Sequence, residues 1–322
     1  MPNFWNNKYV VVTGGRGFVG SFLVDMLLEA GAAVTVMDTG VRGKNHNPAA
    51  RYVDNRQTDV TSQGNCEVQF RHADAVFNLA AHVGGLYYNI AHQAEQFWGN
   101  AQLLAPPALA AATAGVPIYL QVSTVCCYAH GHNNPAREYN GHIGEPEQGN
   151  AGYAWAKRMG ERICHWAFEG LETRYVMVRP TNIYGKRDYF DDTAHVIPAL
   201  IRKFASKTDP VPVYGGSQRR EFLYVEDAAR GMLAVAEHGE RGEAYNLGTN
   251  GETQVSIAEL AEMIQELVGY KGAIDYIEGV STGDVARRTD CTKIHALGWK
   301  HQVGLWDGLK RTVEWYREKA DG

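Results

Sequence analysis

The feature that most restricts the fold is a glycine-rich turn near the start of the chain. Residues 13–20 are "TGGRGFVG", with Gly14, Gly17 and Gly20 three positions apart, between the apolar run 9–12 and the amphipathic stretch 21–31. Glycines there let the backbone amides at a helix N-terminus approach a pyrophosphate. The pattern therefore predicts a strand, a turn and a helix that bind a dinucleotide; a purely structural turn is the alternative.

Short β-branched runs alternate with helix-like stretches along the first half of the chain, which predicts an α/β fold whose parallel sheet is covered on both faces. The predicted strands are 9–14, 33–38, 75–80, 116–123, 174–180 and 221–225. The predicted helices are 22–31, 153–170, 194–206, 255–269 and 305–319. Ser256 and Glu259 form a plausible capping box for the fourth of these helices.

Composition excludes several classes of protein. The 322 residues include 45% hydrophobic and 21% charged residues, which indicates one large domain or two unequal ones rather than disorder. A net charge of -5 without a basic run does not suit nucleic-acid binding. Residues 96–136 contain no Asp, Glu, Lys or Arg, but Pro106, Pro107, Gly115 and Pro117 divide the stretch, so we expect a helix, a turn and a strand rather than a membrane span.

The five cysteines, Cys66, Cys126, Cys127, Cys164 and Cys291, form no C-x-x-C pair, so we expect no metal site. The odd count fits a reducing cytoplasm. The first 15 residues also lack the basic and then apolar pattern of a secretory signal, which supports the same expectation.

Asp38 ends the second predicted strand, 18 residues after Gly20. A carboxylate at this place can bind the adenosine ribose hydroxyls and repel a 2′-phosphate, which favours NAD over NADP. Arg42 and Lys44 follow closely and could accommodate that phosphate, so NADP stays open.

Tyr153 and Lys157, in "YAWAK", lie four residues apart and share one face of a predicted helix. A phenol with a pKa of about 10 is a poor base at neutral pH unless a nearby cation stabilises its anion. Lys157 supplies such a cation, and Thr124 at the end of the preceding strand could bind the same substrate oxygen. Without that context the pair would be ordinary surface residues.

Together these residues resemble an extended short-chain dehydrogenase/reductase of the nucleotide-sugar epimerase and dehydratase group, over nearly the whole chain. The resemblance is carried by the glycine turn, Asp38, "NLAA" (78–81), Thr124 with Tyr153 and Lys157, "RPTNIYG" (179–185), "RREFLYVEDAA" (219–229), "AYNLG" (244–248) and "DCTKIHALGW" (290–299).

The resemblance implies a Rossmann doubly wound parallel sheet with a smaller C-terminal α/β substrate-binding domain. The NAD-binding domain would comprise 1–185 and about 219–250, and the nucleotide-sugar domain about 186–218 and 251–322. The cofactor residues implied are Gly14, Gly17, Phe18, Val19, Gly20, Asp38, Asp59, Val60, Leu79, Ala80, Ala81, Tyr153 and Lys157. The substrate residues implied are Val83, Gly84, Gly85, Asn182, Lys203, Arg220 and Arg287.

Within the group, sugar 4,6-dehydratases resemble one another in carrying an acid just after the catalytic Ser or Thr, where this chain has Val125 and Cys126. The subgroup of GDP-mannose 3,5-epimerase and GDP-fucose synthase instead carries a cysteine two positions after it, paired functionally with a histidine in "HVIPAL". Cys126 and His195 match both positions. Cys127 has no matching role, and in the expected strand it would point away from Cys126 into the packing.

A C4 ketone acidifies the hydrogens at C3 and C5, and a thiol and an imidazole both exchange protons well near neutral pH. We therefore expect an NAD-dependent nucleotide-sugar epimerase that oxidises C4 and exchanges protons at C5 and/or C3 through Cys126 and His195. The alternatives are a 4-epimerase or 4-keto-sugar reductase in which both residues are structural, and a catalytically silent dinucleotide-binding scaffold.

The family commonly dimerises through the helix that follows Asn100, so a homodimer is expected. Here Pro106 and Pro107 fall within that helix. Because an interior proline removes a helix hydrogen bond, we expect a kink or a late helix start.

Overall fold

The computed structural model describes residues 3–53, 59–131, 135–206, 208–278, 283 and 286–320. Seven parallel strands form its main sheet, in the order β11-β6-β5-β4-β1-β2-β3. These strands are β1 (Tyr9–Thr13), β2 (Ala33–Met37), β3 (Arg51–Tyr52), β4 (Ala75–Asn78), β5 (Ile118–Val122), β6 (Arg174–Pro180) and β11 (Ala244–Leu247). The predicted α/β class and parallel sheet are confirmed.

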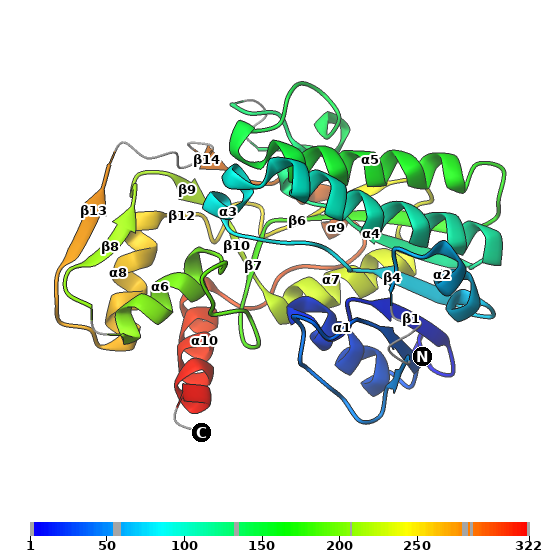
Figure 1. Cartoon of the computed structure of the whole chain (residues 1–322), viewed down its shortest axis with the longest axis horizontal. Coiled ribbons are helices and arrows are strands. Elements are labelled where there is room, and N and C mark those ends of the chain that lie inside the picture. Colours follow the sequence, from blue (N-terminus) through cyan, green and yellow to red (C-terminus); the bar gives the residue numbers. More distant parts are fainter. Residues whose placement is uncertain are drawn as a thin grey trace.

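Helices cover both faces of this sheet (Figure 1). On one face lie α2 (Gln63–Phe70), α4 (Gln93–Ala114) and α5 (Ala151–Ala167), and on the other α1 (Phe18–Glu29) and α7 (Val225–His238). Strand side chains alternate between the faces, so Val10 and Val12 join one buried cluster while Val11 joins the other. Burial on both faces explains why the first strand is continuously apolar.

Most of the remaining elements gather at the end of the molecule where β8, α8 and α10 lie, whereas α9 contacts β11 of the main sheet (Figure 1). Small sheets there pair β10 with β7, β13 with β8, and β9 with both β12 and β14. The strands are β7 (Asn182–Tyr184), β8 (Val211–Tyr214), β9 (Arg219–Arg220), β10 (Phe222–Tyr224), β12 (Val255–Ser256), β13 (Ile274–Ile277) and β14 (Ala286–Arg287). The helices are α3 (Leu86–Ala91), α6 (Val196–Ala205), α8 (Ile257–Val268), α9 (Thr292–His295) and α10 (Leu305–Ala320).

The capping box at Ser256 and Glu259 is present and starts α8. The division of the chain into two domains with the boundaries given above stays a prediction. Among the described residues, no helix has both the length and the apolar character needed to span a membrane.

The expected late start of the helix around Pro106 and Pro107 is wrong, because α4 runs without interruption from Gln93 to Ala114. Pro107 has no N–H to offer the carbonyl of Leu103, one turn earlier. The buried side chain of Asn78 supplies the missing donor, with Nδ2 3.1 Å from the Leu103 oxygen. A hydrogen bond from the neighbouring strand thus replaces one that the helix cannot make.

Helices α4 and α5 lie side by side and carry large exposed apolar side chains (Figure 1). Trp98 and Leu109 are 11 residues apart on α4, as are Trp155 and Trp166 on α5, and this spacing of about three turns puts each pair on one helix face. Trp98 is 63% exposed and Trp166 is 68% exposed. We propose that a second copy of the chain covers these residues.

Replacement of Trp166 by Asp should then weaken the dimer by about 2 kcal/mol or more, which is the usual loss at a central aromatic contact. Sedimentation equilibrium measures this change. Trp306→Asp, at an exposed position on α10, is the matched control and should leave the dimer intact. A monomeric wild-type protein, or equal effects of the two substitutions, would contradict the proposal.

Candidate functional site

The glycine turn lies between β1 and α1, at the point where the strand order of the main sheet reverses direction. Gly14 has φ +68°, and a Cβ on it would lie 3.0 Å from the amide nitrogen of Ala80, at the end of β4. A Cβ on Gly20 would lie 2.2 Å from the Gly14 oxygen. A side chain at either position would collide with backbone atoms of the turn or of the segment after β4, so glycine allows this close approach. The turn leads directly into the N-terminus of α1, which suits the pyrophosphate of a dinucleotide.

Asp38 lies directly after β2, and its carboxylate accepts hydrogen bonds from the backbone N–H groups of Arg16 (2.9 Å) and Gly40 (2.8 Å). The acid predicted to bind the ribose is therefore held against the glycine turn. Arg16 was not among the predicted residues. Its guanidinium lies 4.7 Å from the ring centre of Tyr52, and its buried Nε has no hydrogen-bond partner.

The two basic residues that left NADP open are engaged elsewhere. Arg42 donates to the Val83 carbonyl oxygen (2.6 Å) and to the Thr193 hydroxyl (2.9 Å), while Lys44 donates to the Gly40 carbonyl oxygen. Tyr189, also missed from the sequence, contacts the glycine turn, because the Phe18 N–H donates to its hydroxyl.

The other predicted cofactor residues lie at the carboxyl edge of the sheet or on the glycine turn. Leu79, Ala80 and Ala81 follow β4 directly, and Val60 is buried while Asp59 is exposed. Thr58, which precedes them in the "TDV" segment, lies outside the described residues.

Thr124, Cys126 and Tyr153 lie together. Tyr153 is on α5, and Thr124 follows β5, where its side chain accepts from the Cys126 N–H (3.1 Å). Burial raises the pKa of the Tyr153 phenol, and charge on the neighbouring Cys126 raises it further, while a hydrogen bond from Thr124 lowers it. Because burial dominates, the phenol in this structure is held in its protonated form.

The expectation that the two adjacent cysteines continue a strand is wrong. The strand ends at Val122, and Val125–Cys127 form a single 3₁₀ turn that Thr124 caps. Cys127 is nevertheless fully buried, as predicted, while Cys126 is only half-buried. Both thiols are free, as are the three other cysteines.

Lys157 is one turn beyond Tyr153 on α5, with Nζ 5.6 Å from the centre of the Tyr153 ring. Its ammonium donates to the carbonyl oxygen of Val122 (2.9 Å). Burial lowers the pKa of Lys157 to about 8, against the opposing effect of the Glu161 carboxylate. The Lys157 ammonium therefore lies between the Tyr153 ring and the end of β5.

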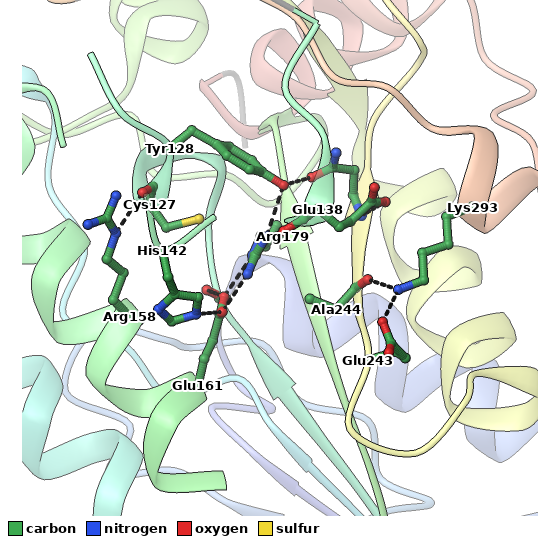
Figure 2. A network of polar contacts seen from close by, with 12 residues as sticks. Cys127, Tyr128, Glu138, His142, Arg158, Glu161, Arg179, Glu243, Ala244 and Lys293 are labelled. Atoms are coloured by element: carbon green, nitrogen blue, oxygen red, sulfur yellow. Dashed lines mark hydrogen bonds and ion pairs between the residues drawn. The ribbon is translucent and has the colours of Figure 1, made fainter. Parts of the chain in front are cut away.

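Behind these residues a buried polar network fastens α5 to the segment that carries Thr124 and Cys126 (Figure 2). Arg158 donates to the Cys127 carbonyl oxygen (2.8 Å), and the Ser123 hydroxyl donates to Glu161. Arg179, on β6, binds Glu161 through two nitrogens, at 2.9 Å and 2.6 Å. The geometry between Tyr153 and the cysteine turn is thus set by side chains outside the reacting set.

Burial alone would raise the pKa of the Glu161 carboxyl, but the Arg179 cation and hydrogen bonds from Arg179, His142 and Ser123 hold it below its usual value. The sequence contained a signal for this pair. Arg179 falls within an apolar strand, where a charge requires a partner, and Glu161 is four residues beyond Lys157.

His195 precedes α6 as its N-cap residue, but its side chain makes no capping hydrogen bond. This disfavours a purely structural role as a helix cap. Although the residue is exposed overall, neighbouring protein atoms displace water from its ring and lower its pKa. Arg42 lowers the pKa further, and Asp191 opposes both effects. Among the interactions of the described residues, none joins His195 directly to Cys126.

Two predicted substrate residues are brought together, because Arg220 on β9 pairs in parallel register with Arg287 on β14. Burial and the Arg287 charge lower the pKa of Arg220 to about 10, while Cys126 and Glu147 oppose the shift. Two neighbouring guanidiniums repel each other, and both attract an anion, so the pair suits a diphosphate. The charge of Cys126 thus acts on both Tyr153 and Arg220.

The remaining substrate candidates are more dispersed. The Asn182 side chain donates to the Glu221 carbonyl oxygen (2.9 Å), next to Arg220 in the chain. Lys203 donates to the Pro212 carbonyl oxygen (2.8 Å) and lies over the Tyr214 ring. Gly84 is buried, and the Gly85 N–H donates to the Thr193 carbonyl oxygen (3.0 Å), beside the segment that leads to His195.

Comparison with known proteins agrees with this geometry. Residues 10–248 match the model of the NAD dependent epimerase/dehydratase family. A putative GDP-L-fucose synthase 2 of Arabidopsis thaliana is 33% identical, over 97% of this chain and 92% of the relative. The GDP-L-fucose synthase of Escherichia coli K12 is 30% identical, over 98% of both chains.

Among solved structures, the UDP-glucose 4-epimerase of Thermotoga maritima with UDP-glucose is 26% identical and has a TM-score of 0.87, over 97% of this chain and 99% of that one. The chain belongs to the NAD-dependent epimerase/dehydratase family of extended short-chain dehydrogenases/reductases, which confirms the resemblance and the Rossmann fold. It is an enzyme of the nucleotide-sugar epimerase, dehydratase and reductase type.

Replacement of Arg179 by Met should destabilise the protein by about 3–5 kcal/mol, because it leaves the Glu161 carboxylate buried without its cation. Urea denaturation at pH 7 measures the change. Arg202→Met is the matched control, because Arg202 pairs with Asp192 at the surface (2.8 Å), and it should cost about 1 kcal/mol or less. Similar losses in the two variants would show that the buried pair does not hold the site together.

Proposed function

We propose that the chain is an NAD-dependent nucleotide-sugar epimerase that oxidises C4 transiently and exchanges protons at C5 and/or C3. The observation that carries this proposal is the hydrogen bond between Thr124 and Tyr153 with Cys126 beside the same phenol. Tyr153, which suits hydride transfer, and Cys126, which suits proton exchange at carbon, thus lie in the same site. A dinucleotide-binding scaffold would need neither, so we do not favour that alternative.

The glycine turn and Asp38 are the residues that would hold NAD, with Lys157 on its nicotinamide ribose. When bound, NAD supplies the hydride acceptor for C4 and a positive charge beside Tyr153. Tyr153 removes the C4 hydroxyl proton, and Thr124 orients that oxygen. Cys126 and His195 then exchange protons on opposite faces of the carbon next to the ketone, before Tyr153 returns its proton and C4 is reduced again.

The substrate we propose is a GDP-sugar, with Arg220, Arg287 and Asn182 near its diphosphate and Lys203 further along the nucleotide. The support for guanine is the similarity of the chain to GDP-L-fucose synthases. A cytoplasmic location is proposed on the five free thiols, which suit a reducing compartment.

The second candidate is a 4-keto-sugar reductase resembling GDP-fucose synthase, which would consume a reduced dinucleotide in every turnover. The observation that favours it is the identity of 30–33% to GDP-L-fucose synthases over nearly the whole chain. Both candidates use the same hydride-transfer residues, and they differ in whether the substrate arrives as an alcohol or as a ketone.

Incubation with NAD and GDP-mannose in deuterated water should place deuterium at C5 and/or C3, as measured by proton NMR and mass spectrometry. Cys126→Ser should slow this exchange by about 10²-fold or more while C4 oxidation stays measurable. Cys127→Ser is the matched control, and exchange should persist in it. Tyr153→Phe should abolish both reactions.

If GDP-mannose binds but gains no deuterium, this epimerase assignment fails. The second candidate then predicts that the protein oxidises NADPH when it is given a GDP-4-keto-6-deoxy sugar. If Cys126→Ser exchanges at the wild-type rate, the thiol has no part in the mechanism.

NAD should be the nucleotide released when the purified protein is denatured, because Asp38 repels a 2′-phosphate. Asp38→Ser should raise the ratio of kcat/KM for NADP to that for NAD by about tenfold or more, since loss of a like charge is worth at least ~1.4 kcal/mol. Asp307→Ser, at an exposed position on α10, is the control for a general charge effect. Release of NADP by the wild type would instead favour the reductase.

A further inference from the structure

Arg42 follows Asp38 closely in the chain, yet its guanidinium contacts two other segments, one after β4 and one before α6. It donates to the Val83 carbonyl oxygen (2.6 Å), beyond β4, and to the Thr193 hydroxyl (2.9 Å), just before His195. It also lies over the Tyr189 ring, with Cζ 4.1 Å from the ring centre. The fork of an arginine makes these contacts together, which the point charge of a lysine cannot do.

The segments that Arg42 joins also contact one another directly. The Gly85 N–H donates to the Thr193 carbonyl oxygen (3.0 Å), and a Cβ on Gly85 would lie 2.9 Å from the Ala194 oxygen. Tyr189 reaches the glycine turn through the Phe18 N–H. The start of α6 is therefore held between the cofactor-binding turn and the segment after β4, with Arg42 as their common contact.

We propose that Arg42 is the positioning residue for His195: it fixes the 189–195 segment on the cofactor-binding half of the molecule, so that the imidazole faces the substrate carbon. This inference rests on the proposed role of His195 in proton exchange. Arg42 touches neither the reacting carbons nor Cys126, and it acts through Thr193 and Tyr189. The residue considered for a cofactor phosphate thus controls the second half of the proton-exchange pair.

The charges around His195 give this role a signature that a merely structural role lacks. The charged groups that act on its ring are Arg42, whose cation lowers its pKa, and Asp191, whose carboxylate raises it. Asp191 also accepts from Thr193 (2.7 Å) and lies 3.5 Å from Arg42. Removal of the Arg42 charge should raise the pKa of His195, and removal of the Asp191 charge should lower it.

The direct experiment is NMR titration of the histidine rings in the full chain, without substrate. The His195 signal among the 12 histidines is identified by its loss in His195→Gln. Arg42→Gln should move the His195 titration to higher pH, and Asp191→Asn should move it to lower pH. Arg42→Lys keeps the charge without the fork, so it should leave the titration near that of the wild type.

Deuterium exchange into GDP-mannose gives the second readout. Arg42→Gln and Arg42→Lys should both slow exchange by about tenfold or more, because a displaced base loses part of the 10²–10⁴-fold that proton transfer contributes. C4 oxidation should fall much less in both. Arg202→Gln is the control. It removes a surface cation that pairs with Asp192, and it should change neither readout.

An unchanged His195 titration in Arg42→Gln, or exchange and oxidation falling equally in the Arg42 variants, would overturn the inference. If the wild type exchanges no deuterium, the proposed function fails, and the histidine titrations still decide whether Arg42 governs His195. The two failures are therefore distinguishable.

Discussion

The arrangement of the candidate site depends on the buried ion pair of Glu161 and Arg179. A charge removed from water is strongly unfavourable unless a partner and hydrogen bonds compensate it, so these two side chains permit little movement around them. Arg179 belongs to β6, an inner strand of the main sheet, and Glu161 belongs to α5, which also carries Tyr153 and Lys157. Because Ser123 joins the same pair, the ion pair fixes the hydride-transfer helix and the cysteine turn against one strand.

The buried side chain of a second residue also fixes several elements against one another, at the cofactor-binding end of the sheet. Asn78, at the end of β4, accepts from the Thr13 hydroxyl and donates to Gln121 (3.0 Å) and to the Leu103 carbonyl oxygen (3.1 Å). It therefore holds β1, β5 and α4 together directly below the glycine turn. The buried polar groups beneath the carboxyl edge of the sheet hydrogen-bond to one another, so this edge can remain open to ligands.

The sequence allowed prediction of what depends on local chemistry. The glycine turn, the capping box at Ser256 and the predicted strands and helices are encoded within a few residues and are present, whereas α2, α7, β8 and β13 were not predicted. The cysteine turn was misassigned because two apolar residues after a strand do not reveal where its pairing ends. The hydrogen bond that the helix loses at Pro107 is replaced by Asn78, and the position of the Arg42 guanidinium is set by Val83 and Thr193. Such long-range partners have no spacing in the sequence from which they could be inferred.

The charge of Cys126 acts on both Tyr153 and Arg220, and its closeness to Tyr153 suggests an order of events within the proposed reaction. A negative charge on the sulfur disfavours one on the phenol oxygen, because charge on Cys126 raises the pKa of Tyr153. In the proposed cycle Tyr153 carries the proton of the C4 hydroxyl at the stage when the ketone exists, so no phenolate then lies beside the sulfur. Proton exchange at the neighbouring carbon would then be favoured at the stage when that carbon is acidic.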